Sequence, residues 1–176
     1  MSDYFKCVPV GLDFLEQTKN VHRAEQVIRA TPEQIFEVFE DEVAWTVWVP
    51  PIQRVEWTSP KPFGIGTTRT VYMVGDMVGY EEFIAWEPGK RMAFTFIGCS
   101  KDNTEKFLED YRVEDLGDGT CRVVWYMAME SPGGPSWSDA IRRPLMTAFN
   151  RWMFRRFRKY AEEYALKAST SSVQTL

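Results

Sequence analysis

The sequence predicts an α+β fold in which one antiparallel sheet of six or seven strands holds a single long helix near the C-terminal end. Residues 52–130 consist of short runs that alternate apolar and polar side chains and are separated by turn residues, which is typical of antiparallel strands. Residues 136–168 have helical periodicity with one apolar face. Because no second long helical segment exists to cover that face, we expect the helix to pack on the sheet.

The C-terminal helix is expected to bury one stripe of side chains spaced three or four residues apart. This predicted stripe consists of Met146, Phe149, Met153, Phe157, Tyr160 and Tyr164. The basic side chains of the helix are Arg142, Arg143, Arg151, Arg155, Arg156, Arg158 and Lys159. Because the aromatic residues fall on the buried stripe and not among the basic ones, we interpret the basic face as solvated. That interpretation is preferred over nucleic acid, which we do not expect as a partner, and over membrane contact.

Composition is that of a single globular domain without a membrane span. The chain has 176 residues, a net charge of −4 and a large aromatic set of 12 Phe, 7 Trp and 7 Tyr, enough for a substantial core. The apolar run at 8–15 is interrupted by Pro9, Gly11 and Asp13, so it predicts neither a signal peptide nor a membrane span. Its three cysteines are widely spaced, which favours reduced thiols and a cytoplasmic location.

The first part of the chain predicts an extension, a strand and short helices. Residues 1–21 are apolar without a clear period and are expected to pack outside the domain or beside its opening. Residues 21–28 read as the first strand. Thr31-Pro32-Glu33-Gln34 then predicts a helix start, with Thr31 as N-cap, proline at the first helical position and Gln34 three residues after the cap. The helical segment ends before Pro50 and Pro51, which require extended backbone.

The remaining elements are predicted as a meander of strands. Strand-like runs cover 52–57, 60–66, 67–74, 79–86, 91–97, 106–116 and 120–130. Turn residues separate successive runs, among them Gly75-Asp76, Pro88-Gly89 and Gly117-Asp118-Gly119. A polar tail at 169–176 is expected to be disordered.

The order and spacing of these elements resemble a known superfamily. The matching segments are Ala30-Thr31-Pro32, Trp45 with Trp48, Gly64 with Gly66-Thr67, Trp86-Glu87-Pro88-Gly89-Lys90-Arg91, and Gly119-Thr120. They are similar to the START-like (SRPBCC) superfamily of helix-grip folds, in its polyketide cyclase/dehydrase and lipid-transport branch, over residues 22–168. The resemblance implies a curved sheet wrapped around the helix and an internal cavity for a hydrophobic molecule. Members of this superfamily include lipid carriers, polyketide cyclases and ligand sensors.

Alternation along the strands places large side chains on one face of the predicted sheet. From the residues alone this face is either an ordinary packed core or the lining of a cavity, and the resemblance favours the cavity. The predicted ligand contacts are Trp48, Arg69, Glu82, Phe94, Phe96, Glu109, Tyr111, Trp125, Met127, Phe149 and Met153.

Three charged residues alternate with apolar ones in the predicted strands, namely Arg69, Glu82 and Glu109. One interpretation is that one or more of them faces solvent. The other is that they face the interior, where each needs a partner, such as Tyr72 or Tyr111, or Tyr126, and where they anchor a ligand. A carboxyl group in such an apolar setting would have a raised pKa that suits proton transfer.

These observations predict non-covalent binding of a small hydrophobic or aromatic molecule, such as a lipid or polyketide, by a carrier or sensor. The alternative is an enzyme of the polyketide cyclase/dehydratase type that acts in the same cavity. His22 is the only histidine, and neither metal-ligand spacing nor a nucleophile motif is present, so no metal and no cofactor are predicted. The ligand's identity and the oligomeric state stay open.

Overall fold

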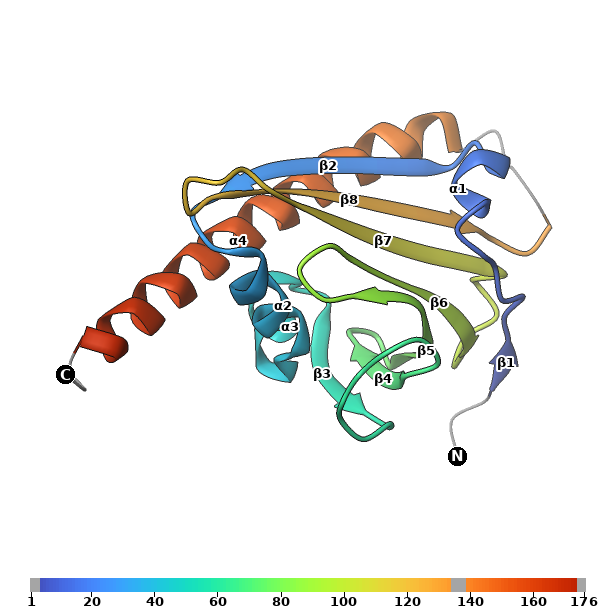
Figure 1. Ribbon diagram of the computed structural model, residues 1–176. Helices are drawn as coiled ribbons and strands as arrows, with labels where there is room; N and C mark the ends of the chain where they lie inside the picture. The colour runs from blue at the N-terminus through green and yellow to red at the C-terminus, as the bar shows by residue number, and fades with distance from the viewer. Residues whose placement is uncertain (1–3, 134–138, 174–176) are drawn as a thin grey trace.

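The computed structural model describes residues 4–133 and 139–173 and confirms the predicted fold class (Figure 1). A curved antiparallel sheet has the strand order β2-β8-β7-β6-β5-β4-β3. These strands are β2 (Val21–Ile28), β3 (Ile52–Trp57), β4 (Thr68–Met73), β5 (Met77–Glu87), β6 (Arg91–Cys99), β7 (Lys106–Asp115) and β8 (Cys121–Glu130). A two-residue strand, β1 (Phe5–Lys6), pairs with the end of β6.

The short helices lie between the first two long strands of the chain, as predicted. They are α2 (Pro32–Glu40) and α3 (Glu42–Trp48), and a single turn of helix, α1 (Phe14–Gln17), precedes β2. Thr31 caps α2 by accepting the backbone N–H of Gln34 at 3.3 Å, while the Gln34 side chain accepts the Thr31 N–H at 3.0 Å. Asp41 ends α2 and caps α3. The two helices therefore form a compact pair whose buried side chains, Phe36, Phe39, Trp45 and Trp48, join the core.

One predicted strand is wrong. Residues 60–66 form turns and irregular backbone, although they were expected to be extended. Pro60 and Pro62 lack the N–H groups that a central strand would donate. Gly66 has a φ of 83°, a left-handed conformation that strands do not contain.

The long helix α4 (Asp139–Val173) packs chiefly against β2, α2 and α3. Its core-facing residues are Asn150, Met153, Phe154, Phe157, Ala161 and Ala165. The prediction that Phe149 is buried is wrong, because its side chain is 39% exposed. The buried face is rotated by roughly 60° from the predicted one, at 100° per residue. The prediction counted large apolar side chains, whereas the actual face also uses two alanines and an asparagine.

The two ends of α4 also differ from expectation. The helix continues to Val173, so residues 169–173 are helical where a disordered tail was predicted. Residues 174–176 and the predicted helix start at residue 136 lie outside the described residues. Pro144 lies inside the helix.

The N-terminal segment covers the outer face of the sheet. It runs along β6 where β7 diverges, and the N–H of Cys7 donates to Ile97 O at 3.2 Å. Farther along, Phe14 is 2% exposed and packs with Leu108 and Ala128. The centre of the sheet is therefore covered on both faces. The domain boundary at residue 21 stays a prediction, and so does the cytoplasmic location, although all three cysteines are free and buried.

Candidate functional site

A buried ion pair lies on the inner face of the sheet. Strand pairing places Arg69 on β4 beside Glu81 on β5, and the Arg69 Nε–H donates to Glu81 Oε2. Both residues are less than 5% exposed. The Arg69 guanidinium also lies 4.0 Å from the ring centroid of Trp45 and 4.6 Å from that of Phe94. Aromatic rings attract a cation on their faces, so this shell stabilises the Arg69 charge away from water.

A second polar pair lies on β7, close enough to the first to interact electrostatically. The Tyr111 hydroxyl donates to Glu109 Oε2 at 2.5 Å, and both residues are buried. Burial raises the pKa of Glu109 to about 8; the Tyr111 hydrogen bond opposes this shift, the Glu81 charge adds to it and the Arg69 charge opposes it. Glu109 is therefore largely protonated near neutral pH.

The two other acidic groups of this cluster are also shifted by burial. Desolvation raises the pKa of Glu81, and the Arg69 charge opposes the shift. Desolvation raises the pKa of Tyr111 well above its ordinary value, and the neighbouring Glu109 adds to this. We refer to Arg69, Glu81, Glu109 and Tyr111 as the inner polar cluster.

Several donors around the cluster have no hydrogen-bond partner among the described residues. They are Arg69 Nη1, Trp48 Nε1 and Trp125 Nε1, all buried. The Trp48 and Trp125 rings both contact Tyr111, with centroids 6.5 and 5.8 Å from its ring. By contrast, the nearby Trp45 Nε1–H donates to Phe39 O at 2.8 Å.

An unpaired buried donor costs about 1–3 kcal/mol, so such groups are uncommon and call for an explanation. The Trp125 indole N–H lies near Glu109 and favours its charged form, but it does not reach hydrogen-bonding geometry. Each of these donors would be satisfied by an acceptor oxygen within hydrogen-bonding distance.

Most of the sequence-predicted site residues lie on the inner face or pack against it. They are Trp48, Arg69, Phe94, Phe96, Glu109, Tyr111, Trp125, Met127 and Met153. Phe149 is not among them, because it points away from the core. The prediction that at least one of the three charged residues meets a tyrosine hydroxyl is confirmed by Glu109 and Tyr111, although the cavity in which they were placed stays a proposal.

Glu82 does not take the inward position that a ligand anchor would require. It is half-buried and lies beside Thr68 and Thr95 in the neighbouring strands, while Glu81 occupies the inward position next to Arg69. Apolar residues flank both positions because β5 is covered on both faces: Phe83 packs inward and Ile84 packs outward with Phe14. Alternation alone therefore does not show which glutamate is buried. Sequence reasoning missed Glu81; a signal that could have drawn attention to it is the need of a buried Arg69 for a neighbouring carboxylate.

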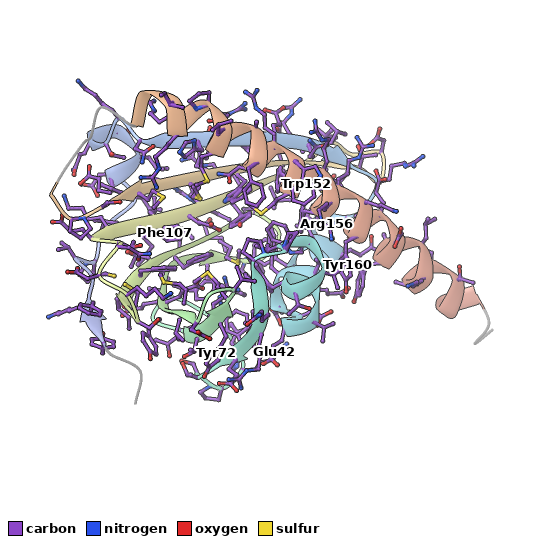
Figure 2. The ribbon with its side chains drawn as sticks, turned by 180° about the vertical axis from the view of Figure 1, so that it is seen from behind. Glu42, Tyr72, Phe107, Trp152, Arg156 and Tyr160 are labelled. Carbon is purple, nitrogen blue, oxygen red and sulfur yellow. The ribbon has the colours of Figure 1, made fainter. Side chains whose placement is uncertain are left out.

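The inner face is less covered at the end away from α2 and α3. Phe107 on β7 (Figure 2), Met129 on β8 and Met146 on α4 are half-buried there and pack against the core. His22 closes part of this end, since its Nδ1 is hydrogen-bonded with Thr147 Oγ1 at 2.8 Å. A small pocket of about 30 Å³ lies at this end, and His22, Met129 and Met146 are among the residues that line it.

Two kinds of feature are absent from the described ranges. In residues 4–133 and 139–173, no three His, Cys, Asp or Glu side chains gather to form a group able to hold a metal ion. No helix in the part of the chain that the structure describes is long and apolar enough to cross a membrane.

The curved sheet and C-terminal helix are those of START-like helix-grip proteins. The protein TTHA0849 from Thermus thermophilus has the same fold, with 20% identity and a TM-score of 0.62 over 85% of this chain and 99% of that one. A START superfamily protein from Mycobacterium smegmatis has 13% identity and a TM-score of 0.62 over 84% and 98% of the two chains. At these identities the likeness shows the fold alone.

Sequence similarity gives the family within that fold. Residues 21–162 match the family described as polyketide cyclase / dehydrase and lipid transport, and the chain belongs to it. An uncharacterized protein of Mycobacterium tuberculosis is 44% identical over 158 residues, which cover 90% of this chain and 94% of that protein. An uncharacterized protein of Mycobacterium bovis matches to the same extent. The family and the fold together indicate a ligand-binding domain.

Proposed function

We propose that this protein binds a small hydrophobic or aromatic molecule, such as a lipid or polyketide, non-covalently between the sheet and α4, as a carrier or sensor. The observation that carries the proposal is the set of unpartnered buried donors, Arg69 Nη1, Trp48 Nε1 and Trp125 Nε1. A ligand oxygen that accepts from these donors would offset the cost of burying them. The ligand therefore combines an apolar body with at least one acceptor oxygen.

The apolar body of the ligand would extend from the inner polar cluster toward Phe107, Met129 and Met146. Methionine side chains are flexible and adapt to ligands of different shape. These three residues are half-buried, so a ligand there would displace fewer packed groups than one placed beneath α2 and α3. This end is the proposed entrance to the interior.

A polarity-sensitive apolar dye, N-phenyl-1-naphthylamine, tests the proposal directly. It should bind saturably and be displaced by fatty acids or aromatic compounds, and Trp125→Ala or Tyr111→Ala should weaken its binding. Tyr126→Ala is the matched control, because Tyr126 is the next residue on β8 and contacts Arg23 and Arg112 on the outer face. Equal loss in the control and in Trp125→Ala would place binding outside the inner face.

A matched pair of displacers tests the role of the donors. 2-Acetonaphthone should displace the dye at lower concentration than 2-ethylnaphthalene, because the two differ chiefly in a carbonyl oxygen that accepts hydrogen bonds. Trp125→Phe keeps an aromatic ring but removes the N–H, so it should reduce this difference. Equal potency of the two compounds on the wild-type protein would contradict the assignment of the donors to a ligand oxygen.

A second function, that of a polyketide cyclase or dehydratase, is favoured by one specific observation. Glu109 has a pKa raised to about 8, which suits a group that gives and takes a proton near neutral pH. If the protein converts a polyketide-like substrate, Glu109→Gln should abolish conversion while dye affinity stays within about threefold. That result would replace the carrier assignment with an enzymatic one.

A further inference from the structure

The first half of α4 exposes an apolar stripe on the side opposite the core. Ile141 and Leu145 are 62% and 66% exposed, and Phe149 and Trp152 are 39% and 41% exposed. At 100° per residue these four side chains fall within a sector of about 80°, facing away from the buried Phe157. The Phe149 and Trp152 rings contact each other with centroids 5.6 Å apart. We call these four residues the α4 apolar stripe.

Positive charge borders the α4 apolar stripe. Residues 140–161 contain seven of the 21 Lys and Arg residues and no Asp or Glu, although the whole chain has a net charge of −4. On the helix, Arg151 and Arg155 follow one edge of the stripe and Arg142 the other, while Arg156 continues the line of the stripe one turn beyond Trp152. The Arg156 guanidinium donates to Val47 O at 2.7 Å and lies 5.3 Å from the Trp152 ring centroid (Figure 2).

We propose that the α4 apolar stripe docks this protein on the surface of an anionic lipid bilayer, with the first half of α4 lying parallel to the membrane. Exposed aliphatic and aromatic side chains flanked by arginines are the composition of interfacial helices. The stripe would enter the boundary between headgroups and acyl chains. The arginines, whose long stems let their charged ends reach outward, would contact the lipid phosphates.

The charge and chemistry of the surface favour a bilayer over other occupants. A second copy packed on the same face would bring two sets of arginines together without carboxylates to balance them. A nucleic acid would use the arginines and rings, but Ile141 and Leu145 offer no stacking surface for bases. An anionic lipid surface provides negative charge and apolar volume side by side, which matches both the arginines and the stripe.

The α4 apolar stripe and the proposed entrance lie on different sides of the same part of α4. Met146 lies on α4 between Leu145 and Phe149 and borders the less covered end of the inner face. The docking proposal does not depend on the proposed ligand, because it uses the opposite side of the helix. The two proposals can therefore fail separately.

Vesicle co-sedimentation of the full chain tests the docking proposal. The protein should sediment with phosphatidylcholine vesicles that contain phosphatidylglycerol, bind pure phosphatidylcholine much more weakly, and lose binding as salt is raised. Leu145→Gln/Trp152→Gln should lose at least about tenfold in affinity, because it removes two inserted side chains. Arg151→Gln/Arg155→Gln should lose about fivefold for each charge removed, on anionic vesicles only.

Leu166→Gln is the matched control for these variants. Leu166 lies on the same helix and is 68% exposed, but it is close to Glu162 and Glu163. It should leave vesicle binding unchanged, and circular dichroism should show equal melting for all variants because the altered side chains are exposed. The proposal is overturned if Leu166→Gln loses as much binding as Leu145→Gln/Trp152→Gln, or if anionic vesicles are not bound. Binding of oligonucleotides in place of vesicles, or a dimer that Leu145→Gln/Trp152→Gln dissociates, would equally overturn it.

Discussion

Glu109 and Asp110 are neighbours on β7, both are buried, and they face opposite sides of the sheet. Asp110 accepts hydrogen bonds from Arg91 Nε and Nη2 at 2.8 and 2.9 Å and from Arg112 Nε at 2.8 Å. Glu109 accepts one hydrogen bond, from the Tyr111 hydroxyl. In the inner polar cluster one arginine, Arg69, lies beside two glutamates and is ion-paired with Glu81. Burial alone therefore does not distinguish the two carboxyl groups. What distinguishes them is how fully their hydrogen-bonding capacity is used.

The network around Asp110 on the outer face and the inner polar cluster also differ in their access to water. The Arg91 and Arg112 side chains are 26% and 48% exposed, so the outer network reaches water and can rearrange. The Arg69 and Glu81 side chains are 1% and 5% exposed, and donors beside them stay unpartnered. A fully paired outer network is what a structural role requires. The inner polar cluster has unpartnered donors beside it, and the proposed binding role needs such donors to hold a ligand oxygen.

The largest effect is expected from breaking the inner ion pair. Arg69→Met should reduce the free energy of unfolding by about 3–5 kcal/mol, because it leaves the Glu81 carboxylate buried without its cation. Arg69→Met/Glu81→Gln should recover most of that loss, since the charge is then removed as well. Urea denaturation measures both values. A double variant no more stable than Arg69→Met would show that the loss comes from packing and not from charge.

A smaller effect is expected on the outer face. Asp110→Asn should cost about 1–3 kcal/mol, because it weakens three charged hydrogen bonds while leaving both guanidinium groups access to water. Dye binding should stay unchanged, since Asp110 faces away from the interior. Loss of dye affinity in a folded Asp110→Asn protein would contradict the separation of the two networks.

The pH dependence of stability should separate Glu109 from Asp110. Because burial raises the pKa of Glu109 to about 8, the folded state holds this proton more tightly than the unfolded state does. Its contribution is fully present below the ordinary carboxyl pKa and is lost as pH rises through about 8. Glu109→Gln should remove that decline and be more stable than the wild type above pH 8 by up to about 5 kcal/mol.

Burial also raises the pKa of Glu81, so the free energy of unfolding should fall with rising pH because of Glu81 as well. Glu109→Gln should leave that part of the fall in place. Chemical denaturation at a series of pH values checks the prediction. An unchanged profile in Glu109→Gln would mean that Glu109 is ionised in the folded protein at neutral pH.

The smallest effect is expected from Arg112→Gln. Arg91 would still donate two hydrogen bonds to Asp110, and Arg112 is half-exposed, so the change should cost about 1 kcal/mol or less. Thermal melting can compare it with Arg69→Met. Similar losses of stability in the two variants would contradict the distinction between a solvent-exposed outer network and a buried inner one.

Local signals in the sequence were sufficient for the fold. The Thr31 cap and Pro32 located α2, and alternation located the inward faces of β6, β7 and β8. Glu109 and Tyr111 were placed on the same face because they are two residues apart on one strand. Such inferences succeed where one residue pattern has one structural meaning.

The errors occurred where packing from distant segments decides the outcome. Which of Glu81 and Glu82 is buried depends on the N-terminal segment that covers the outer face of β5. The rotation of α4, and with it the position of Phe149, depends on contacts with β2, α2 and α3. The spacing of apolar residues within one element determines neither the buried glutamate of β5 nor the rotation of α4. The exposed stripe on α4 was missed for the same reason.

Native mass spectrometry of the protein purified from its own host tests most directly whether the inner polar cluster holds a ligand. The wild type and Asp110→Asn should carry the same small-molecule mass, and Arg69→Met/Glu81→Gln, folded by its near-ultraviolet circular dichroism, should carry none. A wild-type protein with no bound small molecule, or the same mass retained by the double variant, would contradict the account.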